Sequence, residues 1–414
     1  MPVRCSHLSL AAVLLIAVPA PIRAAAEDNA LRPEVGKPLQ AAEGLVKEQK
    51  FAAALAEIRK AEAAAPLTEK ETALVAQLRG IAAVGTGDIP IAVKSFEMAI
   101  ASGRLTPADQ LRLTRTVSVL YYQEKNYPNT IIWAKRALDA GGGDEQTRIL
   151  LAQAYYLSED LPAAGRTLQE QIGAAERAGR TPAEAQLQLL ANIELRQNDT
   201  EGYETTLKKL VAVYPRPQYW AGLIQRLSSR PGFPRRLVLD VYRLSQAVGA
   251  LSSATHYTEA AELALQAGLP GEARRLLDQG FTAGVLGHGP GADRQERLRA
   301  LAAERSAADL RSLPDQQKAA ADGADLVMVG LDYLGHGQPK EAAALIEQGL
   351  AKGVTANPED AKLHLGIAYY AAGRKDKSRE IFQTVQGAGD ADLARLWAIH
   401  NGSPIPGKTA AANE

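Results

Sequence analysis

The sequence predicts an all-α fold in which helical hairpins stack into a solenoid. Its composition is rich in Ala, Leu, Gln, Glu, Lys and Arg and only 5% aromatic, which favours helices because these side chains lose little freedom on a helix. The stretch 324–386 shows the plan twice, as an apolar-periodic helix, a short turn and a second helix. At 414 residues the chain exceeds one compact core, so two domains or one elongated array are expected.

Within the second half of that stretch, each helix carries three residues on one face. They are Leu365, Gly366 and Tyr369 on the first helix, and Ser378, Phe382 and Val385 on the second. Small residues beside a bulky one let two helices approach closely. The same slot recurs about every 34 to 39 residues earlier in the chain, at Ala54, Ala92, Thr130, Ala164 and Tyr203. This spacing predicts at least five units in phase.

The repeated unit resembles the tetratricopeptide repeat (TPR), a helix–turn–helix of roughly 34 residues. The likeness covers most of 38–386 and is clearest at 38–104, 107–142, 145–173 and 324–386. It implies a TPR-like helical-hairpin solenoid that winds as a right-handed superhelix. It also implies that the first helices of the hairpins line a groove that holds a protein or peptide partner.

Five segments are expected along the chain. They are a signal peptide at 1–26, an N-terminal TPR array at 27–215, divergent helical repeats at 216–323, C-terminal TPR units with a capping helix at 324–400, and a disordered tail at 401–414. Within the divergent segment, residues 287–295 hold three glycines and a proline, which is typical of a loop or hinge.

The first 26 residues have the pattern of a secretory signal. Arg4 supplies a positive charge, residues 8–18 form an apolar run, and Ala24 to Ala26 form an A-x-A cleavage site. Cleavage would remove Cys5, the only cysteine, so the mature chain would be exported without disulfides. These observations predict a periplasmic or secreted protein, and favour the bacterial periplasm.

The resemblance to TPR units also assigns a partner-binding groove. Carried over slot by slot, the residues facing this groove are Arg112, Arg115, Tyr122, Gln153, Tyr156, Gln188 and Asn192. Arg and Tyr often carry interface energy because each combines contact area with directional hydrogen bonds. The two arginines suggest an acidic or carboxylate-bearing partner segment, bound as an extended strand or as a helix. The alternative is that all seven are ordinary solvated helix residues.

Several kinds of partner and site are not expected. Lys plus Arg and Asp plus Glu both number 47, so neither nucleic-acid binding nor direct membrane binding is indicated. The histidines show no i,i+4 pairing for a metal, and His288 and His336 lie in Gly-rich turns where solvated side chains are expected. Residues 402–409 match the P-loop pattern by letters, but a helix precedes them and two prolines interrupt them. No cofactor is therefore expected.

The function predicted is that of a non-catalytic scaffold or adaptor for protein–protein interaction. No catalytic motif is present, and the order of segments is similar to that of bacterial periplasmic TPR proteins associated with TonB-type energy-transduction systems. The alternative is an enzyme or ligand-binding receptor whose site lies near 287–295. A closed pocket with converging polar groups would favour this alternative.

Overall fold

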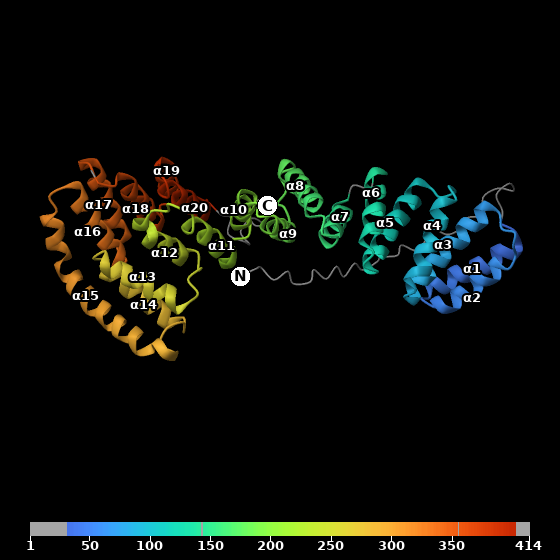
Figure 1. The fold of residues 1–414 in the computed structure, drawn as a ribbon, viewed down its shortest axis with the longest axis horizontal. Helices are drawn as coiled ribbons and strands as arrows, with labels where there is room; N and C mark the ends of the chain where they lie inside the picture. Colours follow the sequence, from blue (N-terminus) through green and yellow to red (C-terminus); the bar gives the residue numbers. More distant parts are fainter. Residues whose placement is uncertain (1–30, 142–143, 355, 403–414) are drawn as a thin grey trace, which may run out of the picture. The chain divides into compact units, whose positions relative to one another are not determined.

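The computed structural model describes residues 31–141, 144–354 and 356–402, and over these residues the chain forms helices and turns without any strand (Figure 1). The all-α prediction is confirmed. The signal peptide, 1–26, and nearly all of the P-loop-like stretch lie outside the described residues. The expected tail begins too early at 401, because Asn401 and Gly402 are the last residues of α20 (Asp390–Gly402).

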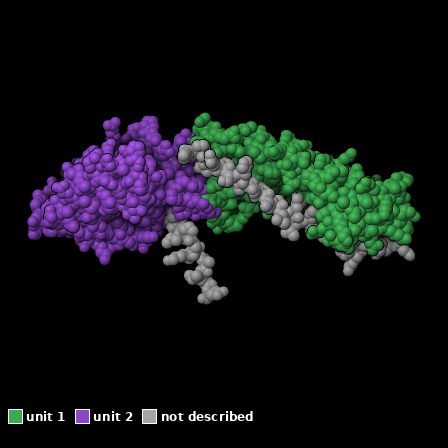
Figure 2. All heavy atoms as spheres, turned by 90° about the horizontal axis from the view of Figure 1, so that it is seen from below, with its two compact units in different colours: residues 1–199 green, residues 200–414 purple. Residues whose placement is uncertain are grey.

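The chain divides into two compact units, residues 1–199 and 200–414 (Figure 2). The sequence placed the end of the N-terminal array at 215, whereas the division falls before α10. The helices of unit 1 are α1 (Pro33–Lys47), α2 (Phe51–Glu62), α3 (Glu69–Thr86), α4 (Ile89–Ala101), α5 (Pro107–Gln123), α6 (Tyr127–Asp139), α7 (Glu145–Leu157), α8 (Leu161–Arg177) and α9 (Glu184–Arg196). They pack in chain order, as hairpins α1/α2, α3/α4, α5/α6 and α7/α8 followed by α9.

Unit 2 contains elements of less regular length, from short 3-10 turns to the 28-residue α15. Its helices are α10 (Thr200–Val213), α11 (Pro217–Ser228), α12 (Val238–Ala247), α13 (Ala254–Gln266), α14 (Pro270–Thr282), α15 (Ala292–Ala319), α16 (Gly323–Gly335), α17 (Pro339–Lys352), α18 (Pro358–Ala371), α19 (Lys375–Thr384) and α20, with short 3-10 turns η1 (Arg235–Leu237) and η2 (Gly289–Gly291). The Gly-rich stretch 287–295 thus forms η2 and the start of α15. Gln295 anchors this stretch, because its Oε1 accepts a hydrogen bond of 2.8 Å from the backbone N–H of Gly287.

Short turns with defined capping chemistry close the hairpins of unit 1. Between α3 and α4, Gly87 adopts φ +78°, a left-handed conformation that costs glycine little. The next residue, Asp88, accepts a hydrogen bond of 3.1 Å from the backbone N–H of Ile91 and so caps α4. Asn126 and Asp160 cap α6 and α8 in the same way. The chain therefore reverses within a few residues, which places each second helix against its first.

The repeat slots predicted from sequence lie in the core. Ala54, Ala92, Thr130 and Ala164 are each fully buried, whereas Tyr203 is only partly buried. In the C-terminal hairpin the approach is so close that a Cβ added at Gly366 would lie 2.3 Å from the ring of Phe382. Ser378 donates a 2.9 Å hydrogen bond to the carbonyl oxygen of Gly366 at the same crossing. Small residues therefore set the helix spacing, as the sequence pattern predicts.

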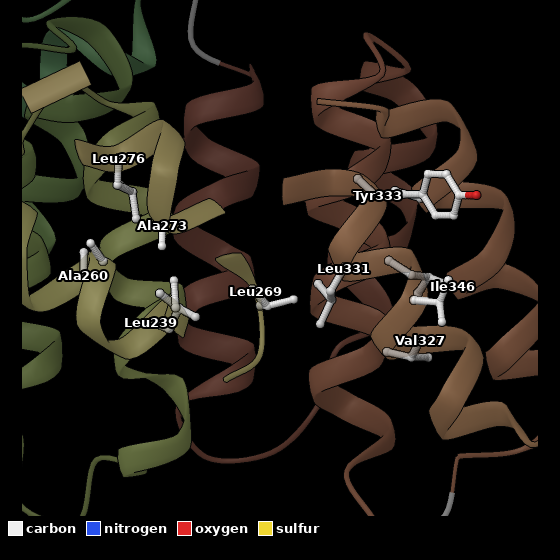
Figure 3. Close-up of a cluster of buried hydrophobic side chains, with 14 of the residues drawn as sticks. Leu239, Ala260, Leu269, Ala273, Leu276, Val327, Leu331, Tyr333 and Ile346 are labelled. Atoms are coloured by element: carbon white, nitrogen blue, oxygen red, sulfur yellow. The ribbon is translucent and has the colours of Figure 1, made fainter. Parts of the chain in front are cut away.

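The core of unit 2 is continuous across several hairpins. Figure 3 shows Leu239, Ala260, Ala273 and Leu276 on one side, and Val327, Leu331, Tyr333 and Ile346 on the other, with Leu269 extending toward Leu331. These residues come from α12, α13, α14, α16 and α17 and from the turn before α14. The apolar surface buried between neighbouring hairpins is the main stabilising contribution in a stack of this kind.

The last helix of unit 2 returns to its first helices. α20 packs against α18 and α19, and it also contacts α10 and α12. Trp220 of α11 lies with its ring centroid 5.9 Å from that of His400 of α20. Ion pairs cross the same junction, since Arg230 lies 2.9 Å from Asp392 and Arg236 lies 2.7 Å from Asp390. Unit 2 is therefore a closed ring of helices.

Candidate functional site

The predicted groove residues of unit 1 lie on three first helices. Arg112, Arg115 and Tyr122 belong to α5, Gln153 and Tyr156 to α7, and Gln188 and Asn192 to α9. All are half-buried except Gln153, which is buried. Apart from Gln153, these side chains are therefore neither core residues nor fully solvated ones.

Both arginines of α5 are already paired with carboxylates of the same unit. Arg112 Nη2 donates to Asp109 Oδ1 at 2.9 Å. Arg115 Nη1 lies 2.9 Å from Asp144 Oδ2, the carboxylate of the residue that caps α7. Because each guanidinium has a carboxylate partner, the pair is not an open cationic site. This weakens the argument for an acidic partner.

The structure brings together two of the predicted residues from different hairpins. The hydroxyl of Tyr156 donates to Asn192 Oδ1 at 2.8 Å, which joins α7 to α9. The guanidinium of Arg196 lies over the Tyr156 ring, 5.2 Å from its centroid. A cation above the ring and a hydrogen bond at its hydroxyl together restrict the rotamer of Tyr156. Asn192 is oriented by the same bond, which directs its amide nitrogen away from the tyrosine.

Tyr122, Gln153 and Gln188 have different surroundings. Tyr122 packs edge-on against Tyr127 with ring centroids 5.8 Å apart, and burial raises the pKa of Tyr122. Gln153 is 7% exposed, and its Oε1 has no hydrogen-bond donor among the described residues. Gln188 lies half-buried on α9. Tyr156 and Asn192 are thus a pair of predicted groove residues that a side-chain hydrogen bond joins across two hairpins.

A second polar centre, which the sequence analysis missed, lies inside unit 2. Arg243 of α12 donates from Nε and Nη2 to the two oxygens of Glu272 on α14, at 2.8 and 2.7 Å. It also donates from Nη1 to Asp240 Oδ1 at 2.8 Å. His364 of α18 approaches the same Asp240 oxygen through Nε2 at 3.0 Å. One buried guanidinium thus joins three helices of the ring.

These buried charges control each other's protonation. Burial alone would raise the pKa of Asp240, but the charges of His364 and Arg243 hold it below its usual range. Burial likewise opposes the charged form of Arg243, and the two carboxylates outweigh that effect and raise its pKa. Asp240 and Arg243 are therefore held in their charged forms. A sequence signal was present, because Asp240 and Arg243 lie three residues apart within an otherwise largely apolar helix.

Three further ionisable groups meet between α15 and α16. His336 Nε2 lies 2.7 Å from Asp309 Oδ2, and the His336 side chain is only 1% exposed. The expectation of a solvated turn histidine is wrong for His336, because it packs against Gly271, where a Cβ would leave no room for the ring. His288, in contrast, is exposed as expected. Burial, and then the neighbouring charge of Asp309, raise the pKa of Asp332 to about 7.

The raised pKa of Asp332 predicts a pH-dependent stability. Its folded pKa lies above its ordinary value of 3.8, so the folded state keeps a proton that the unfolded state loses between pH 4 and 7. Stability should fall through that range and level off above it. Asp332→Asn, whose amide can still donate to Asp309, should remove this loss and stabilise unit 2 at pH 8.

Hydrogen exchange of the full chain at pH 5 and pH 8 would measure this effect. The control is Asp315→Asn on α15, where the carboxylate is 83% exposed, and this change should leave exchange unaltered. Slower exchange in α16 at pH 8 for Asp332→Asn alone is the expected result. Equal exchange in parent and variant at pH 8 would show that the pKa of Asp332 is not raised in the folded state.

Three cavities each lie within a single unit. One of about 240 Å³ is surrounded by α12, α14, α16, α18 and α20, one of about 340 Å³ by α11, α12 and α13, and one of about 330 Å³ by α6, α7, α8 and α9. None of the three is lined by residues 287–295, where the alternative enzyme or receptor site was expected. Tyr370 lines the first cavity, and its hydroxyl lies 2.8 Å from His400 Nε2.

Two properties of the described residues bear on metals and membranes. Over 31–141, 144–354 and 356–402, no group of three or more His, Cys, Asp or Glu side chains is arranged to hold a metal ion. Within the same ranges, no helix combines the length and the apolar character that crossing a bilayer requires.

Comparisons with solved structures find likenesses to TPR proteins. A tetratricopeptide repeat protein from Parabacteroides merdae aligns at 12% identity and a TM-score of 0.34, over 81% of this chain and 98% of that one. Yeast Tom70 aligns at 12% identity and 0.21, over 89% and 95%. The TPR domain of P58(IPK) aligns at 12% identity and 0.23, over 89% and 99%. All three TM-scores lie below 0.5, so these alignments assign no function to the chain.

Comparison with families gives a more local result. No curated protein sequence matches the chain. A tetratricopeptide repeat model matches residues 328–392, which run from α16 to the first residues of α20. The C-terminal hairpins α16/α17 and α18/α19 therefore carry tetratricopeptide-repeat sequence, within a chain whose described residues form an all-helical repeat fold.

Proposed function

We propose that this protein is a non-catalytic scaffold that binds a protein or peptide partner along α5, α7 and α9 of unit 1. The observation that carries the proposal is the Tyr156–Asn192 pair. Its hydrogen bond fixes Asn192 Oδ1 as the acceptor, and the amide nitrogen donates to no described residue. The two N–H groups of the Asn192 amide are therefore already oriented, and they can donate a hydrogen bond to a carbonyl oxygen of a partner backbone.

The surrounding residues favour a neutral or mixed segment over a strongly acidic one. Tyr122 and Tyr156 supply half-buried aromatic rings, which offer contact area at a low entropic cost. Arg112 and Arg115 are paired inside the unit, so an acidic partner would have to displace Asp109 or Asp144. Backbone hydrogen bonds together with aromatic contacts fit an extended peptide or one face of a helix.

Two finer aspects of the proposal concern the location of the protein and the system in which it acts. We infer export to the bacterial periplasm from the predicted signal peptide, and an accessory role in a TonB-type system from the order of segments. Both are supported by the sequence alone. N-terminal sequencing of the expressed protein is the test of export, with a mature start near Glu27 as the expected result and retention of Met1 in a membrane fraction as the contrary one.

Site-specific photocrosslinking would test the binding face. A photoreactive phenylalanine analogue replaces Tyr122 on α5 in one sample, and Ile132 on α6 in the matched control. Ile132 is 47% exposed and belongs to the second helix of the same hairpin. We expect a crosslinked partner from position 122 only, and we expect Asn192→Ala to reduce its yield about tenfold through loss of the oriented amide.

Two outcomes of the crosslinking experiment would contradict the proposal. Crosslinks of equal yield from positions 122 and 132, or an unchanged yield with Asn192→Ala, would place the partner elsewhere. Tyr156→Phe serves as a graded variant, because it removes the hydroxyl that orients Asn192 and leaves the ring in place. Its yield should fall between those of the parent and Asn192→Ala.

A further inference from the structure

The cavity of about 240 Å³ in unit 2 has an organised lining. It lies where five helices of the closed ring converge, and one of its walls comes from α20, the helix that closes the ring. Its lining includes Arg243 of α12, Glu272 and Arg275 of α14, Leu334 of α16, Tyr370 of α18 and Trp397 of α20. All belong to unit 2, so this cavity is independent of the face proposed above.

The inner polar wall is a rigid ion pair. Arg243 and Glu272 are each 9% exposed and share two hydrogen bonds of 2.8 and 2.7 Å. Both oxygens of Glu272 already accept from the guanidinium, and Asp240 takes a third donor of Arg243. A buried pair that is compensated in this way attracts no further ion strongly. It fixes the shape of the wall.

The mouth of the cavity carries an arginine without a carboxylate partner. Arg275 Nη1 donates to the carbonyl oxygens of Leu334 and Gly335 at 2.8 and 3.4 Å, at the C-terminal end of α16. Among the described residues, no acceptor is hydrogen-bonded to its Nε or Nη2, and no Asp or Glu forms an ion pair with it. One edge of the guanidinium is thus anchored to backbone, and the other edge remains for a planar anion.

The remaining wall is aromatic and apolar. The rings of Tyr370 and Trp397 meet edge to face, with centroids 5.4 Å apart and planes at 61°. Trp397 is 2% exposed, and the Tyr370 hydroxyl is engaged with His400. With its hydroxyl engaged, Tyr370 presents carbon atoms to the cavity. This wall suits a flat or short apolar group.

We propose that this cavity binds a small monocarboxylate with a short apolar or aromatic body. The carboxylate lies on the Nε and Nη2 edge of Arg275, and the body packs against Tyr370 and Trp397. The volume equals about eight water molecules at about 30 Å³ each, which is enough for one ring and a carboxylate arm. Charge complementarity at the mouth selects the anion, and the balanced Arg243–Glu272 pair admits no second charge deeper inside.

Phenylacetate is a suitable probe, and the chain's three tryptophans make the experiment site-resolved. The indole N–H signals of the full-length protein are followed by NMR during titration, with Trp397 assigned through its loss in Trp397→Phe. We expect the Trp397 signal to shift saturably while that of Trp133, which belongs to unit 1, stays unchanged. Neutral phenylacetamide should bind at least about tenfold more weakly, because it lacks the charge that strengthens the guanidinium hydrogen bonds.

Variants separate charge from shape. Arg275→Gln should weaken phenylacetate binding about tenfold or more. The variant should then bind phenylacetate and phenylacetamide with similar affinity. Arg294→Gln on α15, where the side chain is 74% exposed, is the charge-matched control and should change nothing. Ala247→Trp at the cavity mouth should block binding, whereas Ala303→Trp on the exposed face of α15 should not.

Three results would overturn the proposal. One is the absence of a Trp397 shift at millimolar phenylacetate in a protein that is folded by hydrogen exchange. Another is equal affinity of the parent and Arg275→Gln. The third is tighter binding by a short peptide ending in phenylalanine than by phenylacetate, which would assign the cavity to a peptide terminus. The photocrosslinking experiment on unit 1 is unaffected by any of these results.

Discussion

Replacing Arg243 by methionine should destabilise unit 2 by about 3–5 kcal/mol, the range typical of removing one partner from a buried ion pair. Methionine fills much of the same space but leaves two carboxylates without their cation. Asp240 is 2% and Glu272 is 9% exposed, so water cannot readily solvate either of them. Hydrogen exchange of the full-length chain, resolved by peptide, should show faster exchange throughout α12, α14 and α18.

A matched control and a compensating variant make this result specific. Arg299→Met removes an ion pair with Asp278 in which both side chains are more than two-fifths exposed, and it should cost at most about 1 kcal/mol. Adding Asp240→Asn and Glu272→Gln to Arg243→Met removes the unpaired charges and should recover much of the loss. If the triple variant were no more stable than Arg243→Met alone, packing rather than charge would explain the effect.

Trp220→Ala should also cost unit 2 about 3–5 kcal/mol, the usual range for truncating a fully buried tryptophan. Trp220 is 1% exposed, and its ring meets His400 across the junction between α11 and α20. The cavity left behind would therefore open the place where the ring closes. Faster exchange should appear in α20 and α10 as well as in α11, because these helices share the junction.

Trp133→Ala is the natural comparison, because Trp133 is a buried tryptophan of unit 1. Its guanidinium neighbour, Arg136, lies 4.7 Å from the ring centroid. This variant should speed exchange in α5 and α6 and leave α20 unchanged. Trp220→Ala would contradict the closed-ring description if its effect stayed within α11.

The hairpins could be predicted because their sequence signal is local. Ala54, Ala92 and Ala164 recur at repeat spacing, and each is fully buried because a small side chain is needed where two helices cross. Periodicity states which face of a helix is buried. It does not state what that face is buried against, and for that reason the charged cluster of unit 2 was missed.

The cluster depends on contacts that are distant in sequence. His364 meets Asp240 across 124 residues, and no local pattern reports such a pairing. His336 was expected to be solvated because its neighbours in the sequence are glycines. In the structure its side chain is buried and pairs with Asp309 of α15. In unit 1 the residue types of the candidate face were predictable, whereas the pairing of both arginines with nearby carboxylates was not.

The contact between α20 and α10 also affects the order in which the two units can fold. A linear stack such as unit 1 can form hairpin by hairpin while the chain is still being synthesised, since each hairpin needs only its neighbour. Unit 2 cannot be completed in that way, because its first helix acquires its last contacts only after the final helix has emerged. We therefore expect unit 2 to fold late and as one cooperative body, and premature termination before α20 to leave the apolar sides of α10 and α12 exposed to proteases.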